Sequence, residues 1–350
     1  MRNAPYCGAV FGALVLAGLA PAAGHAQSAA EFYAGRNVTL YIGSGAGGGY
    51  DVYARALARH MGRHIPGKPN IVSQNMPGAA SLKLTEYLYN VAAKDGSAFG
   101  AVYNTIPIQP LVRDRKPRFD PLGLSWVGSM GKHQNICVAW HTTPFTSFEQ
   151  VKRRQMVVAA TGATGNAVIY PTVFNQMLGT KFKVVGGYQA AEARLAVERG
   201  EAEGICGMSY QTLVASHPQW FEQKRVRVLA QIGLHPHPAL KGAPMALDMV
   251  KKPADRELLE FMMIPQEMGR PFVAPPEVPA DRLAALRQAF AATMTDPAFL
   301  AEAKQLKLQI EPMDHAEMAT LVKRLYAMPK DVIRDARKLM TKKGGGKKKN

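Results

Sequence analysis

Short apolar runs with strand character alternate with segments of helical periodicity along this 350-residue chain, and this alternation constrains the fold most. The helical segments place apolar residues at i, i+4 and i+8, as in Tyr53, Leu57 and Met61. Because parallel strands are joined by helical crossovers, the pattern predicts an α/β fold with parallel sheets covered by helices on both faces. The expected strands cover residues 38–42, 70–73, 99–103, 156–160, 182–185 and 226–230.

The last third of the chain, from Pro279 onward, shows few strand signals and predicts three helices. Its apolar residues form two stripes, one around Phe290 and one around Val322. Helix starts are also marked, since Asp296 stands before a proline at the first helical position. Capping-box spacings occur at Ser147 with Gln150 and at Asp314 with Glu317.

The length and composition suit two globular domains. Hydrophobic residues make up 47% of the chain, which excludes disordered and collagen-like classes. One α/β core seldom exceeds about 250 residues, so a second domain is expected. The residues themselves place a candidate boundary at 113–131, which is poor in strand signals and rich in charge, Pro and Gly.

The chain carries 43 Lys and Arg against 26 Asp and Glu, a formal charge of +17. A nucleic-acid or membrane-surface binder needs such charge clustered on a folded face. Here residues 323–350 alone hold eleven basic and two acidic residues. Much of the charge therefore belongs to the last helix and a Gly-Lys tail, residues 341–350, expected to be disordered. A basic surface-binding protein remains a third interpretation, and no nucleic-acid partner is expected.

The first 26 residues are typical of a secretory signal peptide. Arg2 precedes an apolar run over 10–20, and residues 24–26 fit a small-residue cleavage site. The run is shorter than the roughly 20 apolar residues that span a bilayer. We therefore expect an exported, periplasmic protein from which Cys7 is removed.

Two cysteines, Cys137 and Cys206, remain in the mature chain. Both lie in apolar strand-like runs, 135–139 and 204–207. An oxidising compartment permits a disulfide between them. A buried free thiol is equally natural in such runs, so both alternatives stay open at this point.

The densest motif is a glycine-rich loop, residues 43–49, between the first expected strand and the first long helix. Its glycines let an anion approach main-chain N–H groups at a helix start. Gly43, Gly45 and Gly48 have the spacing of a dinucleotide fingerprint, but the next strand ends without the acidic residue that ribose binding requires. A simple connecting turn is the remaining alternative. We interpret the loop as an anion site.

A second loop of this kind, residues 161–166, follows the strand at 156–160. Hydroxyl groups, glycines and a helix start again predict an anion site, now in the other half of the chain. Pro171 leaves two possible helix starts, because proline breaks a helix in which it lies deep. The helix begins directly after the loop, or near Tyr170, in which case other N–H groups face the ligand.

No motif of catalysis or of metal binding emerges. The sequence holds no G-x-S-x-G, H-E-x-x-H, C-x-x-C or Walker lysine. His235 and His237 stand in a loop without an acidic or Cys residue beside them. This favours solvated histidine side chains over a metal-binding site. The sequence therefore predicts no catalytic residue, no metal and no cofactor.

Several motifs together resemble those of one known family, the solute receptors of tripartite tricarboxylate transporters (the Bug or TctC-like proteins). The resemblance covers nearly the whole mature chain in the family's order. The motifs are residues 45–51, 74–79, 94–96, 161–166, 185–188, 199–204 and 228–230.

The resemblance implies a two-lobed periplasmic binding protein, type II-like, with each lobe a mostly parallel sheet flanked by helices and the ligand in the interdomain cleft. The first lobe would combine residues 31–131 with 268–340, and the second would cover 132–267. The implied ligand is a small carboxylate, such as a di- or tricarboxylate. The implied partners are membrane permease subunits, and a monomer without catalysis is expected.

The family's ligand-binding loops match two sets of residues here. The first loop supplies Ser44, Gly45, Ala46, Gly47 and Gly48, and the second supplies Thr161, Thr164, Gly165 and Asn166. Tyr103, Asn104 and Tyr188 follow expected strands, where side chains select ligands in α/β sheets, although packing explains each tyrosine equally well. A secreted enzyme that uses the glycine-rich loop for an anionic or phosphorylated substrate is the alternative, favoured if acid, base or nucleophile residues converge on the cleft.

Overall fold

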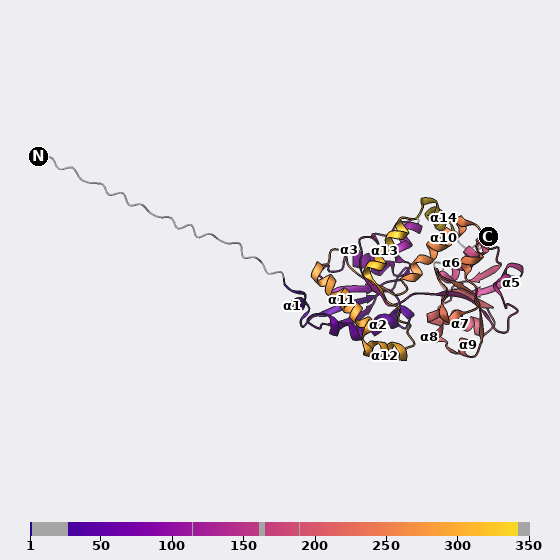
Figure 1. The fold of residues 1–350 in the computed structure, drawn as a ribbon, viewed down its shortest axis with the longest axis horizontal. Coiled ribbons are helices and arrows are strands. Elements are labelled where there is room, and N and C mark those ends of the chain that lie inside the picture. Colours follow the sequence, from indigo (N-terminus) through magenta and orange to yellow (C-terminus); the bar gives the residue numbers. More distant parts are fainter. Residues whose placement is uncertain (2–26, 114, 161–164, 189, 342–350) are drawn as a thin grey trace.

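The computed structural model describes residues 1, 27–113, 115–160, 165–188 and 190–341, which form two mixed β-sheets flanked by helices (Figure 1). Figure 1 shows the two sheets side by side, each with its own helices. The predicted signal peptide lies outside the described residues except for Met1, and so does the predicted tail except for Thr341, which ends the last helix.

The first sheet holds six strands within the described residues, and four of them, β1 to β4, run in one direction. The reversed strand β10 lies between β3 and β4 and is antiparallel to both. A short edge strand, β11, is antiparallel to β4. In spatial order the sheet contains β11 (Met313–Asp314), β4 (Ser125–Ser129), β10 (Pro271–Ala274), β3 (Ala98–Ala101), β1 (Asn37–Ile42) and β2 (Asn70–Asn75).

The second sheet holds five strands within the described residues, and only β5 runs against the others. It lies between β8 and β9 and is antiparallel to both. In spatial order the sheet contains β7 (Phe182–Val185), β6 (Met156–Ala159), β8 (Gly204–Ser209), β5 (Asn135–Trp140) and β9 (Val226–Ile232).

The reversed strands β5 and β10 are the first strands after the chain crosses between the sheets. β4 of the first sheet is followed by β5 of the second, and β9 of the second by β10 of the first. The predicted two-lobed α/β fold, with mostly parallel strands, is thus confirmed, while β5 and β10 make each sheet mixed. The residue bounds given for the two lobes stay a prediction.

Helices cover both sheets (Figure 1). Helices α10 and α14 pack against each other, and α14 also contacts α4 and α6, which belong to different sheets. The helices are α1 (Ala29–Tyr33), α2 (Gly49–Met61), α3 (Leu82–Asn90), α4 (Gln109–Val112), α5 (Phe148–Arg153), α6 (Asn166–Met177), α7 (Ala190–Glu198), α8 (Tyr210–Ser216), α9 (Gln219–Glu222), α10 (Pro253–Met263), α11 (Ala280–Thr295), α12 (Pro297–Gln305), α13 (His315–Tyr326) and α14 (Lys330–Thr341). Short 3-10 turns are η1 (Gly62–His64), η2 (Ile106–Ile108), η3 (Pro238–Leu240), η4 (Ala246–Met249) and η5 (Ile264–Glu267).

The marked helix starts are confirmed. Ser147 and Asp314 form capping boxes with Gln150 and Glu317, and the Asp296 carboxylate accepts from two N–H groups of α12. The expectation of three helices after Pro279 is wrong, because this region contains four, α11 to α14. Its two apolar stripes are in the core, where Phe290 and Val322 are buried.

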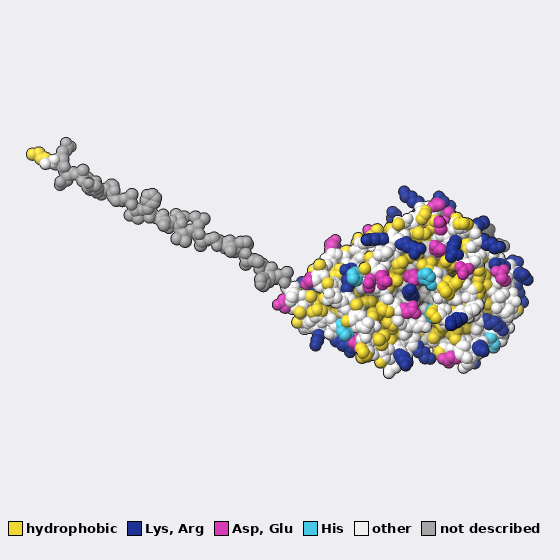
Figure 2. Space-filling model, in the orientation of Figure 1, with side chains coloured by type: hydrophobic (Ala, Val, Ile, Leu, Met, Phe, Trp, Pro, Cys, Tyr) yellow, Lys and Arg dark blue, Asp and Glu magenta, His cyan; other side chains and the backbone are white. Residues whose placement is uncertain are grey.

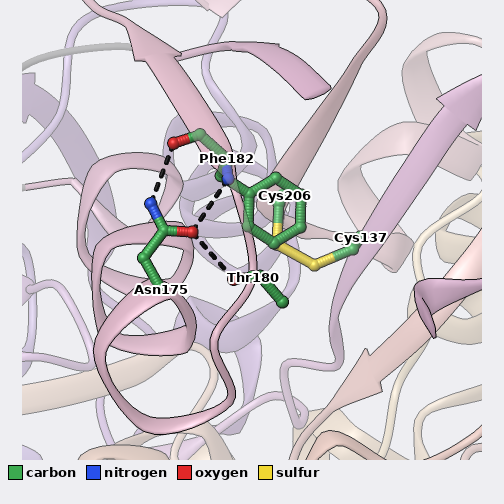
Figure 3. The surroundings of a disulfide bond; sticks show 5 residues. All are labelled: Cys137, Asn175, Thr180, Phe182 and Cys206. Atoms are coloured by element: carbon green, nitrogen blue, oxygen red, sulfur yellow. Dashed lines mark hydrogen bonds between the residues drawn. A yellow bond between two sulfur atoms is a disulfide. The ribbon is translucent and has the colours of Figure 1, made fainter. Parts of the chain in front are cut away.

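Cys137 of β5 and Cys206 of β8 are register partners on neighbouring strands and form a disulfide (Figure 3). This outcome decides between the two alternatives that the sequence left open. Beside the disulfide, the Asn175 side chain joins the end of α6 to β7, since it accepts from Phe182 N and donates to Phe182 O, both at 2.8 Å. The central strands of the second sheet are therefore cross-linked where helix α6 packs on them.

The positive charge on the visible face of the molecule is spread out (Figure 2). Figure 2 shows Lys and Arg side chains scattered across the visible face, among Asp and Glu, and not gathered in one patch. Among the described residues, no helix combines the length and the apolar character that crossing a bilayer requires.

Candidate functional site

A cavity of about 370 Å³ opens where the carboxyl ends of the parallel strands of both sheets meet. Residues that belong to both sheets, and His133 of the first segment that crosses between them, line it. This is the edge at which open α/β sheets bind ligands. The described lining residues are Tyr50, Ala80, Tyr103, Asn104, Thr105, His133, Asn135, Gly165, Asn166, Ala167, Gly207, Met208 and Ser209.

Tyr50, Tyr103 and Asn104 form one wall of the cavity. Tyr50 is the second residue of α2, and its ring stacks on that of Tyr103 with 4.4 Å between centroids. Its hydroxyl donates to Asn104 Oδ1 and accepts from Asn104 N, both at 3.1 Å. This pairing fixes the loop after β3 against the start of α2, so the wall is rigid before any ligand arrives.

His133 lies on the segment that crosses from β4 to β5. Its ring stands edge-on to Tyr50, and its Nδ1 is 3.5 Å from Asn104 Nδ2. Burial, reinforced by the charge of Arg270, holds the pKa of His133 well below its usual value of 6.5. The neutral ring leaves Nε2 without a protein partner among the described residues.

Asn135, the first residue of β5, contributes to the opposite side. Gln266 Oε1 accepts from both its main-chain N at 3.1 Å and its Nδ2 at 2.9 Å. Gln266 Nε2 in turn donates to the Tyr170 hydroxyl at 2.7 Å. These buried bonds lock the second crossing segment, which contains Gln266, onto the second sheet.

The amino terminus of α6 faces the cavity through Gly165, Asn166 and Ala167. The helix begins at Asn166 and continues through Pro171, so of the two possible starts the one directly after the loop is correct. Among the described residues no side chain caps this end, and its first N–H groups carry partial positive charge. Gly207 lies against it, because a Cβ at Gly207 would stand 2.7 Å from the carbonyl carbon of Asn166.

The chemistry of the cavity lining suits an anion. None of the described lining residues is Asp or Glu, whereas three asparagines, a serine and a helix amino terminus supply N–H and O–H donors. Within the described residues no cluster of three or more His, Cys, Asp or Glu is arranged to hold a metal ion. The site can hold a carboxylate by hydrogen bonds without a direct salt bridge.

Of the predicted site residues, the structure brings Tyr103, Asn104, Gly165 and Asn166 together in this cavity. Thr161 and Thr164 lie outside the described residues. Tyr188 is half-buried, does not line the cavity and packs against the core of the second sheet. The ligand roles of the residues outside the lining stay predictions.

The first glycine-rich loop, residues 44–48, is also absent from the lining. Asp51 lies in the first turn of α2 and accepts from Gly47 N at 2.9 Å, so this N–H already has an anionic partner. The Asn75 side chain donates to Ser44 O and to Asp51, which fixes the loop from the other side. The buried Ser44 hydroxyl lacks a partner among the described residues. Ligand binding by Ser44, Gly45, Ala46, Gly47 and Gly48 stays a prediction.

His133, Asn135 and Arg270 are among the residues of the site region that escaped the sequence analysis. His133 and Asn135 flank the start of β5, and Arg270 directly precedes β10. Sequence reasoning searched after strands, where parallel strands present their carboxyl ends. The reversed strands β5 and β10 run the other way, so their first residues lie at the edge where the parallel strands end. A search of the residues before and at the start of each reversed strand would have found all three.

No family model and no curated protein matches this sequence. Solved structures match its fold. A TctC solute-binding protein from Polaromonas, without ligand, is 18% identical with a TM-score of 0.65, over 87% of this chain and 99% of that one. The periplasmic binding protein BugD is 19% identical with a TM-score of 0.66, over 87% and 98%. MatC from Rhodopseudomonas palustris with bound malate is 16% identical with a TM-score of 0.64, over 85% and 99%. At these identities the likeness establishes the fold that this chain shares with periplasmic solute-binding proteins.

Proposed function

We propose that this chain is a periplasmic solute-binding protein of the Bug or TctC type, which captures a small carboxylate and delivers it to the permease of a tripartite tricarboxylate-type transporter. One observation carries the proposal. A cavity of about 370 Å³, lined from both sheets by uncharged donors and by no described acid, lies beside the buried guanidinium of Arg270. The order of motifs along the chain and the malate held by MatC support the same ligand class.

The ligand would lie between the Tyr50 wall and the amino terminus of α6. Its carboxylate groups would accept from the Asn104 and Asn166 side chains and from the first N–H groups of α6. A cavity of this size suits a compact dicarboxylate and is too small to enclose a nucleic-acid strand. Because the two walls come from different sheets, binding would draw the predicted lobes together by a hinge at the crossing segments. The permease would then recognise the closed form.

The alternative, a secreted enzyme for an anionic substrate, requires a nucleophile or a general acid in the cavity. Ser209 is the lining serine, but its hydroxyl donates to Gln211 Oε1 at 3.1 Å, not to a base. No carboxylate of the described residues forms a hydrogen bond with His133 to orient its ring. The described groups therefore favour binding over turnover.

A binding screen tests the proposal. The purified mature chain would be titrated with malate, succinate, adipate, citrate and neutral succinamide in thermal-shift and calorimetric assays, and each solute recovered afterwards by mass spectrometry. We expect one or more carboxylates to raise the melting temperature and to be recovered unchanged. A chain that ignores every carboxylate, or converts one, would contradict the proposal.

The site itself is tested by Asn104→Asp, which is nearly isosteric and keeps the oxygen that accepts from Tyr50. The added negative charge in the cavity should weaken carboxylate binding by roughly tenfold or more. Asn37→Asp is the matched control, because Asn37 is exposed at the amino end of β1, on the opposite edge of the sheet. Equal losses in the two variants would place the ligand elsewhere.

A further inference from the structure

Arg270 is a buried cation at the edge of the first sheet where the cavity lies. It directly precedes β10, which is antiparallel to β3, and its side chain is enclosed, with 3% of the residue exposed. It does not itself line the cavity. Instead it stands behind Tyr50, since the Tyr50 ring, which does line the cavity, lies 4.6 Å from the guanidinium carbon.

The surroundings of Arg270 compensate only part of its charge. Its guanidinium lies over two ring faces, those of Tyr50 and Tyr53, each 4.6 Å from the centroid. Its Nη1 donates to Gly269 O at 3.1 Å and its Nη2 to Thr212 Oγ1 at 3.4 Å, while Nε has no partner. Among the described residues, no Asp or Glu lies within ion-pair distance of this guanidinium. A buried cation without a counter-ion is costly in the empty protein.

The amino terminus of α2 adds to the positive field. Gly49 is the first residue of this helix, and a Cβ on it would lie 3.2 Å from Arg270 Nη2. The partial positive charge of a helix start and a full guanidinium charge are therefore adjacent. The Arg270 charge also reaches the cavity: it opposes the effect of burial, which raises the pKa of Tyr50 to about 12 and that of Tyr103. An anion in the cavity would compensate this excess of positive charge.

We infer that Arg270 is the charge-selecting residue of the cavity, which makes the receptor prefer dianionic over monoanionic and neutral solutes. This inference rests on the proposed function and names its substrate class more narrowly. Arg270 acts through the Tyr50 ring, without a direct bidentate contact, so it responds to the number of charges on the solute and not to the shape of one carboxylate. The neutral donors of the cavity wall would then fix orientation, while Arg270 supplies the counter-charge.

The test compares solutes that share a skeleton and differ in charge. Succinate and adipate are titrated beside their monomethyl and dimethyl esters at pH 8, into the wild type, Arg270→Gln and Arg270→Lys. Each lost solute charge should weaken wild-type binding by roughly tenfold, as expected for Coulomb attraction at an intermediate dielectric. In Arg270→Gln the ratio of diacid to monoester affinity should fall about tenfold, while Arg270→Lys keeps it within about threefold.

Arg282→Gln is the matched control. Arg282 is also an arginine over an aromatic ring, that of Phe32, with an Nε that lacks a partner. It contacts Asp95 O before β3, at the opposite edge of the sheet from Arg270. Its replacement removes the same charge and should leave the ratio of affinities unchanged.

The outcomes separate this inference from the proposed function. A wild type that binds no carboxylate contradicts the function. A wild type that binds diacid and monoester equally well, or an Arg270→Gln variant that keeps the wild-type ratio, overturns the inference and leaves the function intact. Circular dichroism checks the fold of each variant. Arg270→Met, whose straight apolar side chain fits between the two rings, replaces the glutamine variant if that one unfolds.

Discussion

The hydroxyl of Tyr50 and the amide groups of Asn104 form a reciprocal pair, in which Tyr50 donates to Asn104 Oδ1 and accepts from Asn104 N, both at 3.1 Å. One phenol thus satisfies a main-chain donor and a side-chain acceptor that lie 54 positions away in the sequence. The pair connects the helix after the first strand to the loop after the third. It explains how a cavity wall built from a helix start and a loop is held together.

Tyr50→Phe should therefore destabilise the fold. Without the hydroxyl, the N–H of buried Asn104 loses its acceptor, which costs about 1–3 kcal/mol of unfolding free energy in urea titrations. Carboxylate binding should weaken as well, because the loop that carries Asn104 loses its anchor. Tyr41→Phe is the control, since the Tyr41 hydroxyl of β1 pairs with the Tyr87 hydroxyl of α3 at 3.3 Å, and neither residue lines the cavity. A cost no larger than in this control would disprove the structural role of Tyr50.

Gly207→Ala should be among the most damaging single changes in the second sheet. Gly207 has φ +98°, which side chains rarely adopt, and its Cβ would meet the main chain of Asn166 and Ala167. The strand and the start of α6 would have to separate, at a cost of roughly 2–4 kcal/mol, and the helix amino terminus would leave the cavity. Urea unfolding and malate titration measure both effects.

Gly200→Ala separates the effect of backbone strain from the effect of a steric clash, which Gly207→Ala combines. Gly200 also has a positive φ, +75°, but a Cβ there meets no atom within 4 Å. Its replacement should cost about 1 kcal/mol through backbone strain alone and should leave binding unchanged. Similar effects of the two substitutions on binding would show that the packing of Gly207 on α6 does not position the site.

Much of the fold was predictable because periodicity depends on local chemistry. All six strands predicted from apolar runs are present, and the bounds of 182–185 are those of β7. β4, β10 and β11 escaped because they are short and take their partners from distant parts of the chain, and β4 lies within the stretch 113–131, which is poor in strand signals. Pairing of that kind comes from tertiary packing, which a local pattern does not contain.

The site was predictable only in part for the same reason. Tyr103 and Asn104 were found by the rule that parallel sheets bind ligands at the carboxyl ends of their strands. Asn166 was found through its loop motif at a helix start. Arg270 was missed because its role depends on the reversal of β10, on burial and on two rings contributed by α2. The motif of five glycines predicted an anion loop. Asp51 already accepts one of its N–H groups, and ligand binding by the loop stays a prediction.

Gly45→Asp tests whether that loop contributes to binding. Gly45 is exposed, has no positive φ and would place a Cβ in open space, so an aspartate fits there without strain. If the loop reaches the ligand, as the sequence predicts, the added carboxylate should weaken malate binding by roughly tenfold at low salt and less at high salt. Binding equal to that of the wild type would restrict the site to the cavity and exclude the loop.

The neutral state of His133 should make stability depend on pH between about 5 and 7. The folded pKa of His133 is lowered, whereas the unfolded chain titrates near 6.5, so below that pH the unfolded state binds more protons. Stability is therefore complete above pH 6.5 and falls as the pH drops toward the folded pKa, by up to about 1.4 kcal/mol per pH unit. His133→Gln should remove this part of the slope in urea titrations at fixed pH values. Working above pH 5 avoids the acidic range, in which the lowered pKa values of Asp296 and Glu302 contribute. An unchanged slope in the variant would mean that His133 does not stay neutral in the folded protein.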